Sequence, residues 1–270
     1  GPCQAADFLP DLALREIGVA HNVSNGAVVV VHPETGEVLA YVGSMDYWNE
    51  TIDGYADSAG RGYPPGSMIR PYITLTALAQ GYTTATMTLD VYQQFPQAFG
   101  VTYEADSPGG EYRGPLSLRE ALVYDAAPPA VQVMNWVGVD DVIRTAHSMG
   151  LTTLLDGPSS YDLSLAEQGG TATLGDLAFS MGVLANGGHM VGTQVPVAWQ
   201  QPGFRTLDPV LVISIEDAAG NLLWEYTPQQ RDTLDPALAY LGPGLATELC
   251  IALGRCPELR VMLSDVEMPV

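Results

Sequence analysis

Residues 61–72 read Arg-Gly-Tyr-Pro-Pro-Gly-Ser-Met-Ile-Arg-Pro-Tyr, and here a loop rich in glycine and aspartate gives way to a helical pattern. The apolar residues that follow the Pro-Pro-Gly have the spacing of a buried helix, which predicts a helix over 67–80. Ser67 would start this helix, and Gly81 would follow its end. Pro71 fits only in the first turn, where a missing N–H loses no partner.

The regions on either side of this helix have different patterns. Two β-branched apolar runs, 26–31 and 38–42, flank a turn sequence and predict a β-hairpin. The stretch over 82–116 is polar and rich in proline and glycine, and no helix or strand is predicted in it. Ser117 and Glu120 then have the spacing of a capping box, which predicts a helix ending near Tyr124.

The rest of the chain has patterns of both helices and strands. Further helices are predicted over 129–136, 139–149, 173–186 and 235–253. Strands are predicted over 209–215 and 222–226, joined by a turn-rich loop into a second hairpin. The order of strands, then helices, then strands favours an α+β fold with an antiparallel sheet flanked by helices.

The charge composition excludes one class of function and restricts the chemistry. The 270 residues include 31 acidic and 10 basic side chains, giving a net charge of −21. A nucleic-acid backbone would be repelled, so nucleic-acid binding is not expected. All ten basic residues are arginine, so the chain has no amine side chain that could lose its proton and act as a base.

Cysteine and histidine spacing gives no sign of a metal or other cofactor. The four histidines are scattered, with none of the spacings typical of ligand pairs. Cys250 and Cys256 are close enough for a local disulfide, and the sequence favours neither the disulfide nor free thiols. No apolar run is long enough to span a membrane, so this chain is expected to be soluble. A membrane anchor or an upstream domain in the parent protein remains an open alternative.

Five collinear segments resemble the transpeptidase domain of class A penicillin-binding proteins, within the serine β-lactamase and DD-peptidase superfamily. These segments are 28–43, 46–72, 116–122, 129–131 and 184–188. The resemblance implies an N-terminal linker over 1–25 and a transpeptidase-like domain over 26–270. It also implies that the C-terminal part of the fold is truncated, with the strand of the third motif, K-T-G, falling beyond Val270. The glycosyltransferase domain that precedes this domain in the family is not expected in the chain.

The resemblance also indicates candidate catalytic positions. Ser67 occupies the position of the nucleophile in the S-x-x-K motif, and Arg70 occupies that of the lysine. Asp125 and Ala127 stand in place of the serine and asparagine of S-x-N. A guanidinium cannot accept the hydroxyl proton, and alanine cannot bond a substrate. Asp125 is expected to pair with Arg70. The alternatives are a helix cap at Ser67, an ordinary ion-paired or surface arginine at Arg70, and a helix cap at Asp125.

The resemblance implies one leading function and leaves two alternatives. The first is a catalytically inactive module of peptidoglycan synthesis, outside the cytoplasm, that acts in binding or scaffolding with cell-wall synthesis proteins. The second is an active acyl-serine transpeptidase or carboxypeptidase, which would take a peptidoglycan stem peptide or a β-lactam at Ser67. The third is a glycan- or peptide-binding surface made by loops rich in tyrosine.

Overall fold

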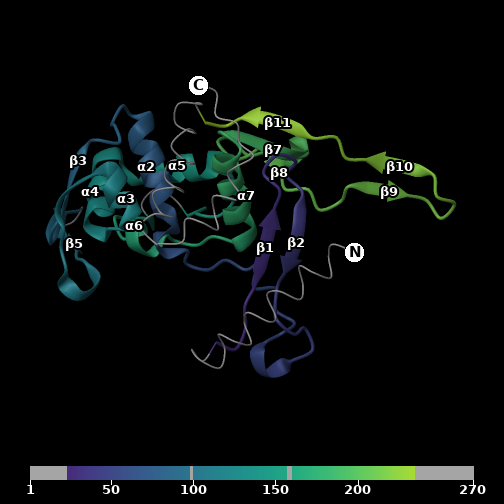
Figure 1. Cartoon of the computed structure of the whole chain (residues 1–270), viewed down its shortest axis with the longest axis horizontal. Coiled ribbons are helices and arrows are strands. Elements are labelled where there is room, and N and C mark those ends of the chain that lie inside the picture. The colour runs from purple at the N-terminus through teal and green to yellow at the C-terminus, as the bar shows by residue number, and fades with distance from the viewer. Residues whose placement is uncertain (1–22, 98–99, 157–159, 235–270) are drawn as a thin grey trace, which may run out of the picture. The chain divides into compact units, whose positions relative to one another are not determined.

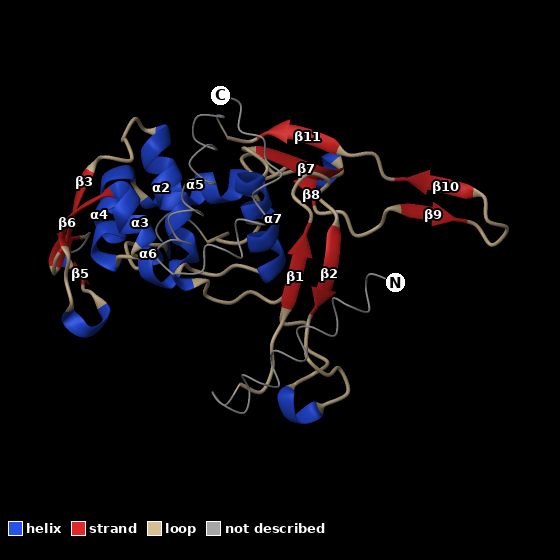
Figure 2. Ribbon diagram, in the orientation of Figure 1, coloured by secondary structure: helices blue, strands red, loops and turns tan. Residues whose placement is uncertain are grey.

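The structure is a computed structural model that describes residues 23–97, 100–156 and 160–234 (Figure 1). Within these residues the chain divides into two compact units. The first unit consists of residues 23–65, 143–156 and 170–234, and the second consists of residues 66–142 and 160–169. Both units contain helices and antiparallel strand pairs, which confirms the predicted α+β class (Figure 2).

The first unit begins with the hairpin that the sequence predicts. β1 (Val28–Val31) pairs antiparallel with β2 (Val38–Val42). In the turn, the amide of Gly36 donates to the carbonyl of His32 at 2.8 Å. Gly36 has a φ of +72°, and a Cβ there would lie 2.2 Å from the carbonyl oxygen of Val191. The backbone conformation and the close contact together require glycine in this turn.

Helix α7 (Leu174–Ala185) packs against β1 and against β7 (His189–Gln194) in the same unit. The helix begins where the Thr173 hydroxyl accepts a bond from the amide of Asp176 at 3.0 Å. It ends at Asn186, which is the C-cap. These boundaries confirm the helix predicted over 173–186.

Two further strand groups complete the sheets of the first unit. β7 pairs antiparallel with β8 (Leu207–Asp208) and with β11 (Gln229–Asp232). β9 (Ser214–Glu216) and β10 (Leu222–Glu225) form a separate antiparallel hairpin.

This second hairpin was predicted, but its first strand begins later than the predicted residue 209. Val210 instead forms an isolated bridge to Glu37 of the first hairpin. The amide of Val210 donates to Gly36 at 2.8 Å, and the amide of Val38 donates to Val210 at 2.9 Å. The apolar run therefore first bonds the β1–β2 turn and then crosses to pair with β10.

A buried ion pair ties the start of α7 to neighbouring loops of the first unit. Arg205 Nη1 donates to Asp176 Oδ1 at 2.6 Å and to the carbonyl of Gly150 at 2.5 Å. Arg205 Nε donates to Asp208 at 2.7 Å. The other oxygen of Asp176 accepts bonds from the amide and the hydroxyl of Thr152. Both charges are thus paired and hydrogen-bonded, as burial requires.

The second unit packs its helices around α2 and α4. A 3₁₀ turn, η2 (Gly66–Ile69), leads into α2 (Arg70–Ala79), and α2 packs against α4 (Ala127–Val137). The capping box at Ser117 and Glu120 is present, as predicted, and it starts α3 (Leu118–Val123). The remaining helices are α5 (Val139–Met149), which crosses the division between the units, and α6 (Leu165–Gln168). Further 3₁₀ turns among the described residues are η4 (Pro108–Gly110) in the second unit, and η1 (Glu50–Ile52) and η6 (Val197–Trp199) in the first.

The sequence predicts no strand over 82–116, but the structure has two short strand pairs there. β3 (Met87–Asp90) pairs with β6 (Gly114–Ser117), and β4 (Gln93–Pro96) pairs with β5 (Thr102–Ala105). Four-residue strands are too short to show a clear alternation in the sequence. Tertiary contacts stabilise them instead, such as the bond from the Leu89 amide to the Gln132 side chain of α4 at 3.0 Å.

Some predictions concern residues that the structure does not describe. The helix over 235–253, both Cys250 and Cys256, and residues 1–22 of the predicted linker lie outside the described residues. In the described part of the chain, no helix is both long and apolar enough to cross a membrane. Among the same residues, no cluster of three or more histidine, cysteine or acidic side chains is arranged to hold a metal ion.

Candidate active site

Ser67 lies in the turn that leads into α2, at the position the sequence predicts for the start of the helix. The residue before it, Gly66, has a φ of +59°, a left-handed conformation that glycine adopts readily. The Ser67 side chain is partly exposed and has no hydrogen-bond partner among the described residues. The interpretation of Ser67 as a side-chain cap is wrong, because the cap of α2 is Ile69 and no side-chain bond is made there. The 3₁₀ turn explains the difference, since it adds a turn before the α-helix begins.

Arg70 is buried at the first position of α2, with 7% of its surface exposed. Its Nε donates to the carbonyl of Ala166 at 3.2 Å, and its Nη1 donates to the Asp125 carboxylate at 2.5 Å. The same Nη1 also donates to the Asp125 carbonyl. A positive charge at a helix N-terminus is unfavourable by itself, so these three oxygens are what make the buried guanidinium tolerable.

The predicted pairing of Arg70 with Asp125 is therefore confirmed. Asp125 follows the C-cap of α3, Tyr124, and has a φ of +50°. Its amide donates to the carbonyl of Leu122 at 3.2 Å. The alternative that Asp125 caps a helix is wrong, because the C-cap of α3 is Tyr124 and the N-cap of α4 is Ala126. The Asp125 side chain is 56% exposed, whereas that of Arg70 is 8% exposed. The carboxylate thus reaches inward from the surface to a buried partner.

Ala127 is the first residue of α4 and is buried, with 5% of its surface exposed. The cap of this helix is Ala126, whose side chain makes no hydrogen bond. The methyl group of Ala127 can neither donate nor accept a hydrogen bond. The residues predicted for the second motif therefore contribute one acceptor, Asp125, which is already bonded to Arg70.

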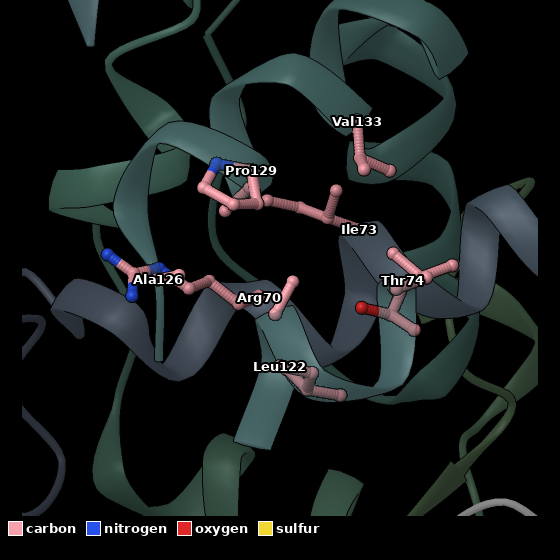
Figure 3. Close-up of a pocket in the computed structure, with 10 residues that line it drawn as sticks. Arg70, Ile73, Thr74, Leu122, Ala126, Pro129 and Val133 are labelled. Atoms are coloured by element: carbon pink, nitrogen blue, oxygen red, sulfur yellow. The ribbon is translucent and has the colours of Figure 1, made fainter. Parts of the chain in front are cut away.

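An apolar pocket lies beside Arg70, between α2, α3 and α4 (Figure 3). Arg70, Ile73 and Thr74 line it from α2, and Pro129 and Val133 line it from α4. Its free space is about the size of one water molecule. This pocket is a packing gap in the second unit and is too small for a peptide or a lactam ring.

Sequence reasoning missed the contribution of α6 to this site. Ala166 supplies a carbonyl to Arg70 across 96 positions of sequence. Its neighbour Glu167 accepts a hydrogen bond from the Tyr103 hydroxyl of β5. Burial, followed by the bond and the charge of Glu167, raises the pKa of Tyr103. A backbone carbonyl carries no signal in sequence, and nothing else in the sequence indicates that α6 and α2 meet.

Ser67 stands at the entry to a buried helix, and a serine becomes a nucleophile only when a base lies within hydrogen-bond reach. The family described as "Penicillin binding protein transpeptidase domain" matches residues 26–216. The chain belongs to this family, as the sequence resemblance indicated.

Individual relatives match over most of this chain but over a small part of their own length. Penicillin-binding protein 2D of Bacillus subtilis (strain 168) is 27% identical over 221 residues, which are 80% of this chain and 28% of that protein. Penicillin-binding protein 1A of Neisseria flavescens is 32% identical over 172 residues, which are 63% of this chain and 21% of that protein. The chain therefore spans less than a third of the length of these relatives.

Solved structures share the fold at low sequence identity. PonA1 from Mycobacterium tuberculosis in complex with penicillin V has a TM-score of 0.68 and 17% identity, over 90% of this chain and 62% of that chain. Penicillin-binding protein 1A from Haemophilus influenzae has a TM-score of 0.68 and 18% identity, over 84% of this chain and 35% of that chain.

Proposed function

We propose that this chain is a transpeptidase-like module of peptidoglycan synthesis that has lost acyl transfer and acts by binding or scaffolding. Family membership supports the assignment to peptidoglycan synthesis. The observation that carries the loss of catalysis is the bonding of Arg70 to the Asp125 carboxylate and to two backbone carbonyls. We place the module outside the cytoplasm, in a parent protein with a membrane anchor and with cell-wall synthesis proteins as partners.

The chemistry of the family explains why this bonding matters. Acyl transfer requires a base that takes the proton from the serine hydroxyl as its oxygen attacks a carbonyl carbon. A lysine three residues after the serine can do this when its amine is neutral, and an arginine cannot. Asp125 can only accept hydrogen bonds while ionised, so it cannot relay a proton as a serine hydroxyl would. Ala127 lacks the side-chain amide with which the asparagine of the motif would orient a substrate.

Labelling with a fluorescent penicillin tests the proposal. A general base contributes about 10²–10⁴-fold to such a step, so acylation is expected to be at least about 100-fold slower than in an active family member. Intact mass spectrometry should show no adduct above that of the Ser67→Ala variant. An active transpeptidase domain of this family serves as the positive control. A stoichiometric adduct on Ser67 that is lost in Ser67→Ala would overturn the assignment.

The alternative is an active acyl-serine transpeptidase or carboxypeptidase that reacts with penicillin through Ser67. It is favoured by one observation, the partly exposed Ser67 hydroxyl with no bonded partner among the described residues. A variant that combines Arg70→Lys, Asp125→Ser and Ala127→Asn restores both motifs. The alternative predicts that the unaltered chain is already labelled through Ser67. Labelling that appears only in this variant and depends on Ser67 would count against the alternative and support the loss of catalysis.

For the binding role, the loop after β2 offers exposed aromatic rings. Tyr47, Trp48 and Tyr55 are 61%, 85% and 64% exposed, whereas Tyr72 is fully buried and Tyr82 stacks on Trp136. The exposed rings are available to stack on a sugar or a peptide. Calorimetric titration with muropeptides should give heat that Trp48→Ala abolishes. Absence of both heat and a shift in melting temperature would remove this binding mode.

A further inference from the structure

The β9–β10 hairpin projects from the β7–β8–β11 sheet of the first unit (Figures 1 and 2). Its two strands contact each other far more than they contact any other described helix or strand. Every residue of both strands is exposed. A two-stranded hairpin with no further packing is marginally stable in water, so this hairpin is a candidate for a docking element.

The strand register divides the hairpin into an apolar face and a polar face. Trp224 lies opposite Ile215, and the amide of Tyr226 donates to the carbonyl of Ile213 at 2.8 Å. Opposed residues of an antiparallel pair share a face, and residues two apart in a strand do so as well. Ile213, Ile215 and Trp224 therefore form one surface, which we call the hairpin apolar face. The neighbouring pair, Glu225 and Ser214, lies on the opposite face.

The hairpin apolar face is open among the described residues. Ile213 is 60% exposed, Ile215 is 49% exposed and Trp224 is 40% exposed. Leu222 and Leu223, at the irregular step in the register, add further exposed apolar surface. Contiguous apolar surface rimmed by polar groups is typical of a protein interaction site.

Hydrogen bonds at its tip and its base hold the hairpin in shape. At its tip, Asp217 accepts bonds from the amides of Ala219 and Asn221 and from the Asn221 side chain, at 2.7–2.9 Å. These bonds from Asn221 come first among the causes that lower the pKa of Asp217, so its carboxylate stays ionised. At its base, the Tyr226 hydroxyl donates to the carbonyl of Thr35 at 2.9 Å. A preformed surface avoids part of the ordering cost of binding.

The charge around the face indicates the chemistry of the partner. Residues 206–230 contain four acidic residues and no basic one, within a chain of net charge −21. A second copy of this chain would bring carboxylates against carboxylates, and an anionic lipid surface would be repelled. Within the described part of the chain, both outer strand edges of the hairpin are also unpaired, and such edges accept an extended segment.

We propose that the hairpin apolar face docks an extended segment of another protein, in which apolar side chains alternate with lysine or arginine. The segment would pair along a strand edge of the hairpin, which places its apolar side chains beside Ile213, Ile215 and Trp224. Its basic side chains would then lie on the opposite face, near Glu216 and Glu225. This docking does not depend on whether Ser67 can be acylated, so its test and the penicillin test fail separately.

The probe is a short fluorescein-labelled peptide of alternating isoleucine and lysine, titrated with the full chain and followed by anisotropy. Ile215→Ser is expected to weaken binding about tenfold, because it removes roughly half of a buried aliphatic side chain. The matched control is Val197→Ser in η6. Val197 is an aliphatic residue outside the hairpin, and it is 83% exposed. The control should bind like the unaltered chain, and all variants should keep the same circular dichroism spectrum.

Three results would overturn the proposal. The first is equal binding by the Ile215→Ser variant, or by a peptide with glutamate in place of lysine. The second is a dimer in sedimentation velocity that Ile215→Ser dissociates, which would assign the face to a second copy. The third is protection of Trp224 from hydroxyl-radical oxidation in the free monomer, which would assign the face to another segment of this chain.

Discussion

The Asp125→Asn variant is expected to lower the free energy of unfolding by about 1 kcal/mol. A hydrogen bond to a charged group is worth about 1.5–3 kcal/mol, and a fully exposed ion pair about 0.2–1 kcal/mol. The pair of Arg70 and Asp125 lies between these limits, since the arginine side chain is 8% exposed and the aspartate side chain 56%. The two carbonyl bonds of Arg70 survive the change, which keeps the loss below that of a buried unpaired charge.

A second variant, Asp125→Ala, separates the contribution of the carboxylate charge from that of the backbone conformation at residue 125. Asp125→Ala should lower the free energy of unfolding by about 2 kcal/mol. About 1 kcal/mol of this is the lost charge, and about 1 kcal/mol is the strain of alanine at a φ of +50°. Asparagine accepts this conformation as aspartate does.

The assay is equilibrium urea unfolding of the full chain, followed by circular dichroism. The matched control is Asp232→Asn, whose partner His189 lies at 2.9 Å in a pair with side chains 83% and 35% exposed. That variant should change the unfolding free energy by about 0.5 kcal/mol or less. If Asp125→Asn matches the unaltered chain, the carboxylate does not stabilise the arginine. If Asp125→Asn is as costly as Asp125→Ala, the backbone conformation adds nothing to the loss; either result refutes the reasoning.

Three further predictions concern the first unit and the turns. Asp176→Ala should destabilise by about 1.5–3 kcal/mol in urea unfolding, because it removes one of the two carboxylates bonded to Arg205 and the acceptor of the Thr152 bonds; a loss under 1 kcal/mol would contradict this. Burial lowers the pKa of His147 below 6.5, although its bond with the Thr153 carbonyl works against the shift. The unfolded chain then binds the proton more readily, so stability should fall as the pH drops below about 6.5. This part of the pH dependence should be missing in His147→Gln. Gly36→Ala should prevent folding, since its Cβ would lie 2.2 Å from a carbonyl oxygen, whereas Gly81→Ala, with φ of +93° in open space, should cost about 1 kcal/mol; equal melting temperatures for the two variants would refute the steric argument.

Elements stabilised by local chemistry could be predicted from the sequence. The helix after the capping box at Ser117 and the helix over 139–149 were both found where the pattern placed them. The β1–β2 hairpin was found as well, because its turn and its β-branched residues are adjacent in sequence. In each case the residues that determine the element lie within about one turn of it.

Elements stabilised by distant contacts could not be predicted. β7 and β11 pair across about 40 residues, and the sequence of β11, Gln-Gln-Arg-Asp, has no apolar alternation. The pairing of Arg70 with Asp125 could be predicted only because the family motifs place the two residues at one site. The bond from Arg70 to the carbonyl of Ala166 could not be predicted, since every residue has the same backbone oxygen.

The two carbonyl oxygens bonded to Arg70 have an evolutionary consequence. A single mutation to the lysine of the family motif would place a compact ammonium where a planar fork now reaches three oxygens on two other segments. At least one buried acceptor would then lose its donor, and the single mutant would be less stable than the present chain. Because selection acts on each mutation separately, a change from arginine to lysine is disfavoured as long as Asp125 and α6 provide acceptors for the arginine. Descendants of this sequence are therefore expected to keep Arg70 wherever they keep Asp125.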